Sequence, residues 1–166
     1  EAVAAVRAGT AAVHLHVRDA SGDESLRRDD VAACVSAVRD ALPGVRVGVS
    51  TGLWITDGDP DRRAADIATW DALHARARPD FASVNIHEAG ALELAEALLE
   101  RGVGVEAGLW HGEAAHLCVE SGLAERCTRL LLEPLVQDLD EALAAVADME
   151  RELEGAAPEV PRLLHG

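Results

Sequence analysis

Residues 104–110 read GVEAGLW, and the alternation of their side chains decides between two architectures for the fold. Successive side chains of a β-strand point to opposite faces, so one face of this strand would carry only aliphatic residues, Val105, Ala107 and Leu109. The other face would carry small, polar or aromatic residues, namely Gly104, Glu106, Gly108 and Trp110. A strand of an open parallel sheet, covered by helices on both sides, is usually apolar throughout. This strand instead indicates a barrel, whose strands turn one face to helices and the other to the interior.

Similar strand patterns recur along the chain and alternate with amphipathic helical patterns. Strands are expected at residues 12–18, 46–51, 81–86, 104–110, 128–134 and 161–166. Helices are expected up to Gly9, at 29–42, 62–77, 90–101 and 138–154, and directly after 111–113. This order indicates right-handed βαβ units on a parallel sheet. Because the inward faces turn small or polar toward the carboxyl ends, we expect an α/β fold of the (β/α)8 TIM-barrel type.

The composition indicates a single globular domain over residues 1–166, with 49% hydrophobic residues and enough length to bury a substantial core. The net charge of −15 argues against nucleic acid and anionic membranes as partners, since both require a positive surface. No apolar run approaches the roughly 20 residues of a membrane-spanning helix, and no secretory signal pattern is visible. The three cysteines form no CxxC motif, so we expect a reducing, cytoplasmic location.

The absence of lysine excludes one class of carbon–carbon bond chemistry. All 15 residues counted as lysine or arginine are arginines. A Schiff-base aldolase needs a lysine amine, and a metal bridge made by a carboxylated lysine needs the same side chain. Neither mechanism is open to this sequence.

Residues 12–19, AVHLHVRD, place His14 and His16 two positions apart in an apolar segment. On a strand both imidazoles share one face with Arg18, while the intervening aliphatic side chains share the other. The pattern fits either a strand with one wet face or a pair of metal ligands.

Polar residues on the inward faces of the other strands favour metal ligation. The inward polar set comprises His14, His16, Ser50, Ser83, Asn85, His87, Glu106, Glu133 and His165. An unsatisfied buried polar group costs about 1–3 kcal/mol, so these groups must satisfy one another, a metal, water or a ligand. Such a convergence indicates an active site, with the two histidines of residues 12–19 as its metal ligands.

Five segments together resemble the beta-keto acid cleavage enzyme family, whose founding activity is 3-keto-5-aminohexanoate cleavage. They are AGTAAVHLHVRDASGDESL, VGVSTG, PDFASVN, GVEAGLW and PRLLHG, which follow the family's order over essentially the whole chain. The compact forms of the family look most similar. The resemblance implies a zinc-dependent TIM barrel and a homo-oligomer. It also implies condensation of a beta-keto acid with acetyl-CoA, giving acetoacetate and a new acyl-CoA.

The resemblance further implies roles for individual residues. His14 and His16 match the family's zinc histidines, and Glu106 lies on the strand that carries its acidic catalytic residues. The positions that correspond to substrate binding are Ser50 and Thr51 in the STG segment, Ser83 and Asn85. Arg18 either contacts a substrate anion or forms a surface salt bridge with Asp19 or Asp23. Two departures are that Ser83 replaces the usual threonine and that Gly108 stands where many members have a second acid.

By the same resemblance this chain covers roughly strands 2 to 7 of the barrel. The family's third zinc ligand is a glutamate on strand eight, in a segment of the type R-x-G-L-E-D that this sequence does not contain. Two alternatives stay open. One is a metal-dependent hydrolase of the amidohydrolase type, with His87, Glu133 and His165 as further ligands. The other is a non-catalytic barrel remnant that self-associates through its exposed strand edges.

Overall fold

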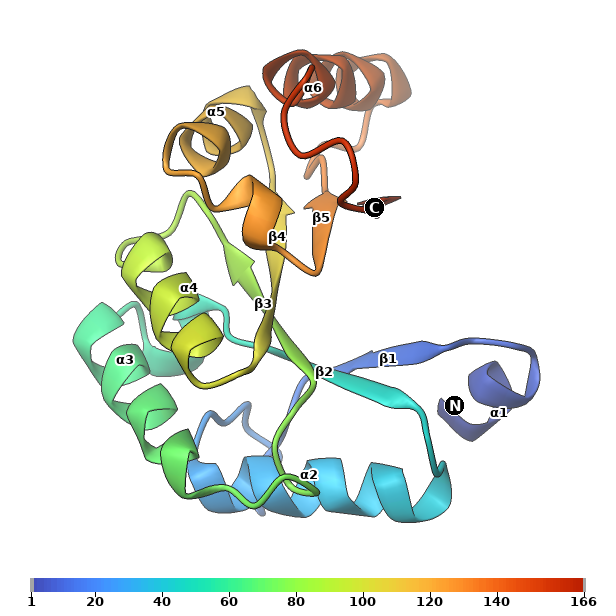
Figure 1. The fold of residues 1–166 in the computed structure, drawn as a ribbon, viewed down its shortest axis with the longest axis vertical. Helices are drawn as coiled ribbons and strands as arrows, with labels where there is room; N and C mark the ends of the chain where they lie inside the picture. Colours follow the sequence, from blue (N-terminus) through green and yellow to red (C-terminus); the bar gives the residue numbers. More distant parts are fainter. Residues whose placement is uncertain (1, 166) are drawn as a thin grey trace. The chain divides into compact units, whose positions relative to one another are not determined.

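The computed structural model describes residues 2–165, in which strands and helices alternate along the chain (Figure 1). The strands are β1 (Ala12–Leu15), β2 (Arg46–Ser50), β3 (Phe81–Asn85), β4 (Gly104–Leu109), β5 (Arg129–Leu132) and β6 (Arg162–Leu164). The α-helices are α1 (Ala2–Arg7), α2 (Arg28–Ala41), α3 (Pro60–Ala68), α4 (Ala91–Glu100), α5 (Gly112–Glu120) and α6 (Leu139–Glu152). Short 3-10 helices lie at η1 (Leu53–Thr56), η2 (Thr69–Ala72) and η3 (Ala124–Arg126).

The six strands are parallel and hydrogen-bond in the order β1-β2-β3-β4-β5-β6. An open doubly wound sheet reverses its strand order at a switch point. Here sequence order and spatial order coincide throughout, as they do in a TIM barrel. The expected fold class is therefore confirmed as an α/β chain consistent with part of such a barrel.

The chain forms two compact units. Unit 1 comprises residues 1–82 and 97–103, and unit 2 comprises residues 83–96 and 104–166. The assignment of residues 1–166 to a single domain stays a prediction. In the described residues, no helix has the length and apolar character needed to cross a membrane.

Unit 1 is held together by the pairing of β1 with β2 and by helix α2. Ala12 to Leu15 lie opposite Arg46 to Val49 in parallel register. Val31 and Val35 of α2 are fully buried, as are Val47 and Val49 of β2. Apolar burial of this kind, at roughly 25 cal/mol per Å², is the main stabilising term of the unit.

Strand β1 is shorter than the predicted strand 12–18. The pairing with β2 ends at Leu15. The backbone then pairs with its own continuation: the amide of Ser25 donates to the carbonyl of Val17 at 2.9 Å, and Arg18 forms an antiparallel bridge with Glu24. The predicted alternation nevertheless holds, because Val13 and Val17 are buried while His14, His16 and Arg18 are exposed.

The predicted helix 62–77 is wrong at both ends. Helix α3 begins at Pro60 because the carboxylate of Asp59 accepts hydrogen bonds from the amides of Asp61 and Arg62 and caps the helix. It ends at Ala68 and continues as η2, in which Trp70 is fully buried. The indole nitrogen of Trp70 donates to the carbonyl of Leu26 at 3.0 Å, a long-range contact that the helical pattern does not reveal.

In unit 2, α5 lies beside α6 (Figure 1). Cys118 of α5 and Met149 of α6 are fully buried. The side chain of Asp138 caps α6 by accepting hydrogen bonds from the amides of Asp140 and Glu141. The remaining predicted helices and strands are confirmed to within a few residues at their ends.

Replacing Gly48 by alanine is expected to destabilise the protein. A Cβ atom on Gly48 of β2 would overlap the ring of the buried Phe81. Overpacking of this kind costs about 1–3 kcal/mol, to be measured by urea denaturation. Gly112→Ala is the matched control, because its new Cβ would meet only ordinary contacts, the nearest at 3.5 Å. Equal stabilities of the two variants would contradict the prediction.

Candidate functional site

The two histidines of β1 and its continuation lie on the exposed face of unit 1. His14 is opposite Gly48 in the register with β2, and His16 follows the end of the strand. Their ring centres are 5.6 Å apart and the ring planes are inclined by 60°. The structure thus brings the two predicted metal ligands together.

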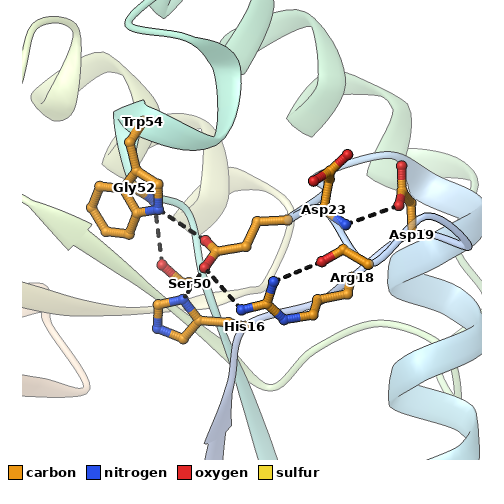
Figure 2. A network of polar contacts seen from close by, with 9 residues as sticks. His16, Arg18, Asp19, Asp23, Ser50, Gly52 and Trp54 are labelled. Atoms are coloured by element: carbon orange, nitrogen blue, oxygen red, sulfur yellow. Dashed lines mark hydrogen bonds and ion pairs between the residues drawn. The ribbon is translucent and has the colours of Figure 1, made fainter.

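Glu24 is the centre of a polar cluster, because its carboxylate contacts both His16 and Trp54. These two residues lie near each other in Figure 2. One carboxylate oxygen, Oε1, lies 3.1 Å from Nδ1 of His16. The other, Oε2, accepts a hydrogen bond of 2.9 Å from the indole nitrogen of Trp54. The rings of His16 and Trp54 are nearly parallel, with centres 6.3 Å apart. We call His16, Glu24 and Trp54 the Glu24 cluster.

Arg18 contacts the Glu24 cluster through the carboxylate of Glu24 and does not pair with Asp19 or Asp23. Its guanidinium donates to the carbonyl of Gly22 at 2.7 Å and lies 3.7 Å from Oε1 of Glu24. The salt bridge that the structure shows for Arg18 is thus with Glu24. Asp19 instead accepts hydrogen bonds from the amides of Ser21 and Asp23, at 2.8 and 3.1 Å, and so shapes the turn.

The environment of Glu24 favours its ionised form. Burial alone would raise the pKa of this carboxyl group. The hydrogen bond from Trp54 and the contacts with His16 and Arg18 outweigh that effect, so the pKa lies below its ordinary value. Glu24 is therefore an acceptor-only group at neutral pH.

Ser50 and Thr51, both predicted to bind substrate, follow one another at the end of β2 and are buried. The Ser50 hydroxyl accepts a hydrogen bond of 3.4 Å from the amide of Gly52. The carbonyl of Thr51 accepts one of 3.3 Å from the guanidinium of Arg63, which is only 1% exposed. A side chain on Gly52 would overlap the indole of Trp54, so glycine lets that ring lie against the backbone.

In unit 2, Asn85 lies at the end of β3 and is buried. Its amide nitrogen donates to the carboxylate of Glu88 at 2.9 Å. A Cβ on Gly108 would lie 2.5 Å from Oδ1 of Asn85. A second acid at position 108 is thus incompatible with the present position of the Asn85 amide. Ser83, two residues earlier on β3, is half-buried.

Glu106, predicted as catalytic, forms an ion pair with Arg129. The two residues are register partners on β4 and β5, and Nε of Arg129 donates to Oε1 of Glu106 at 2.5 Å. Glu106 is 2% exposed and lies in the middle of its strand, three residues before its carboxyl end. A structural role for this carboxylate therefore competes with the predicted catalytic one.

Two further polar groups lie beyond the carboxyl ends of strands in unit 2. His87 packs on Trp110 and His111, with ring centres 4.1 and 5.7 Å away. In the described part of the chain, the buried indole nitrogen of Trp110 has no hydrogen-bond partner. Glu133 and His165 form the second group, with Oε1 and Nδ1 3.1 Å apart.

Sequence reasoning missed the Glu24 cluster and the buried Arg63. Glu24 lies in a segment, DASGDES, that reads only as a turn. Its contact with Trp54 spans 30 residues of sequence, and no local pattern signals it. The pairing of Glu106 with Arg129 was open to prediction, since both are charged residues on neighbouring predicted strands.

A protein-family model described as beta-keto acid cleavage enzyme (BKACE) matches residues 1–151. The chain belongs to this family. Membership implies an enzyme that cleaves a carbon–carbon bond, with beta-keto acids as substrates. The recognition made from the five sequence segments is therefore confirmed.

The geometry of His14 and His16 fits two ligands of one zinc ion. Imidazoles bound to a tetrahedral zinc at about 2.0–2.1 Å have ring centres about 5 Å apart, close to the 5.6 Å observed. Within residues 2–165, however, no three His, Cys, Asp or Glu side chains are grouped so as to hold a metal ion. The described residues of this BKACE family member therefore fit two of the ligands of a zinc site, His14 and His16.

Replacing Glu106 by glutamine is expected to lower the free energy of unfolding by about 3 kcal/mol, because it breaks a buried ion pair. Urea denaturation of Glu106→Gln measures the loss. Arg129→Gln should cost at least as much, since it leaves the Glu106 carboxylate, only 2% exposed, without this cation, whereas Glu106→Gln leaves an Arg129 side chain that is 28% exposed and reaches water. Wild-type stability in Glu106→Gln would show that the carboxylate is not needed for folding.

His87 is expected to make the protein less stable in mild acid. Partial burial lowers the pKa of His87 below its ordinary value, Glu88 partly offsets this, and His111 adds to it. The unfolded state therefore binds the proton more tightly, and stability is lost as the pH falls below about 6.5. His87→Asn should lose less stability than the parent between about pH 8 and pH 5 by urea denaturation. The exposed His74→Asn serves as control; an unchanged pH dependence in His87→Asn would refute the prediction.

Proposed function

We propose that this chain is a zinc-dependent beta-keto acid cleavage enzyme that uses acetyl-CoA as co-substrate. The beta-keto acid R–CO–CH2–COO⁻ and acetyl-CoA would yield acetoacetate and R–CO–CoA, so that all atoms are conserved between substrates and products. The observation that carries the proposal is the pair His14 and His16, exposed on one face with ring centres 5.6 Å apart. Family membership supports the substrate class.

His14 and His16 would hold the zinc ion through neutral imidazole nitrogens. Bound zinc supplies a Lewis acid that stabilises negative charge on a keto oxygen. Two imidazoles leave coordination positions for a carboxylate ligand and for substrate. The third protein ligand is proposed to be the glutamate that the family carries on strand eight, in the segment that this sequence does not contain.

Hydrogen-bonding groups would orient the substrate. In unit 1, Ser50 and Thr51 offer hydroxyls at the end of β2, and the exposed Arg18 offers a cation to a carboxylate or to a CoA phosphate. In unit 2, Ser83 and Asn85 offer a hydroxyl and an amide on β3.

Glu106 is proposed as a catalytic carboxylate that accepts or returns a proton at carbon. Its ion pair with Arg129 fixes the direction of the carboxylate group. A homo-oligomer and a cytoplasmic location also belong to the proposal. The three free cysteines of the described structure support the location.

The proposal predicts that zinc content depends on His16. Metal analysis by mass spectrometry of the purified protein that carries the family's strand-eight glutamate should give near-stoichiometric zinc, which His16→Ala abolishes. His74→Ala is the matched control, since His74 is exposed and lies outside the site. Zinc retained in His16→Ala would refute the metal assignment.

The acetyl-CoA dependence is tested separately by following acyl-CoA and acetoacetate with a panel of beta-keto acids. Both products should appear together and only when acetyl-CoA is present. Release of free acid without acetyl-CoA would indicate a hydrolase of the amidohydrolase type.

A further inference from the structure

We propose that Glu24 is a positioning residue for the metal site, holding His16 in the tautomer and ring orientation that present Nε2 to a zinc ion. The inference rests on the proposed function, because it assumes that His16 is a zinc ligand. It concerns a residue to which the sequence resemblance assigns no role. The contact that carries it is the 3.1 Å separation between Oε1 of Glu24 and Nδ1 of His16.

The chemistry of this contact selects one tautomer. A neutral imidazole carries one N–H, whereas a carboxylate only accepts hydrogen bonds. The proton must therefore lie on Nδ1 for the contact with Glu24 to be a hydrogen bond, which leaves the lone pair of Nε2 for a metal. Carboxylate partners of this kind fix the orientation of metal-binding histidines and raise their basicity.

Glu24 is itself held in place from several sides. The indole nitrogen of Trp54, which can only donate, binds Oε2 at 2.9 Å, so both carboxylate oxygens are engaged. The backbone bridge between Arg18 and Glu24 fixes the start of the side chain. Rotation of the carboxylate away from His16 would break the bond with Trp54.

Trp54 is held by a separate feature of the sequence. The absence of a side chain at Gly52 lets the indole lie against the backbone, and Figure 2 shows Trp54 beside Gly52. The Trp54 ring is nearly parallel to that of His16, with an angle of 22° between the ring planes. His16 is thus oriented both by a hydrogen-bonding partner and by a neighbouring ring. A surface ion pair that formed by accident would need neither Gly52 nor Trp54.

The first experiment measures the tautomer of His16 without any metal. Nitrogen-15 NMR of the metal-free protein at about pH 8, above the ordinary titration range of imidazole, distinguishes Nδ1–H from Nε2–H. The parent should show Nδ1–H at His16. Glu24→Ala should shift His16 toward Nε2–H. Glu24→Gln has one accepting oxygen for the two donors His16 and Trp54, so it should restore the parent signal only in part.

The matched control is Glu152→Ala. Glu152 lies 2.9 Å from Nδ1 of His116 on α5 and makes the same kind of contact away from the metal site. This variant should change the His116 signal and leave His16 unchanged. A His16 tautomer unaltered in Glu24→Ala would overturn the proposal.

The second experiment measures zinc affinity by competition with a chelating dye. Loss of an outer-shell carboxylate typically lowers metal affinity 10–100-fold, which is the range expected for Glu24→Ala. Trp54→Phe keeps an aromatic ring but removes the donor to Glu24, so a smaller loss is expected. The double variant should bind no more weakly than Glu24→Ala, because Trp54 acts through Glu24.

Two outcomes separate this proposal from its alternatives. Complete loss of zinc in Glu24→Ala, equal to that in His16→Ala, would make Glu24 a direct ligand and overturn a positioning role. Absence of zinc binding in the parent would refute the proposed metal centre. The NMR result would still decide whether Glu24 orients His16.

Discussion

The parallel pairing of β1 with β2 determines where the two imidazoles lie. Ala12 to Leu15 align with Arg46 to Val49, which places Val13 in the core and His14 on the exposed face. A shift of the register by one residue would exchange the two faces and bury the histidine. The candidate metal site, the approach of Glu24 to His16 and the position of Arg18 all depend on this one alignment.

Much of the remaining order comes from charged side chains that are satisfied inside the protein. Arg63 reaches the carbonyl of Thr51 from α3, and Glu106 pairs with Arg129 across neighbouring strands. The carboxylate of Asp80 accepts from the amide of Val47 at 2.7 Å and from Arg39 at 2.8 Å. Because a buried charge without a partner is costly, each of these contacts fixes loops and strand ends as well as adding stability.

Sequence periodicity was sufficient to predict the fold class and the shared face of His14, His16 and Arg18, since both follow from local alternation. It was insufficient where a distant contact overrides the local pattern. Helix α3 gives way to a 3-10 turn where Trp70 is buried and bound to Leu26, 44 residues away. The contact between His16 and Glu24, in the turn after β1, was missed for the same reason. The position of the Glu24 carboxylate depends on its hydrogen bond with Trp54, a residue 30 positions away in the sequence.

Gly108 and Asn85 illustrate a limit on how this site can diversify. The Asn85 amide occupies the space that a side chain at position 108 would need, since its Oδ1 lies 2.5 Å from where a Cβ of residue 108 would be. An acid cannot be introduced at 108 in one step without displacing that amide and its bond to Glu88. A side chain at 108 therefore requires the Asn85 amide to move, so the residues tolerated at 108 depend on the residue at 85.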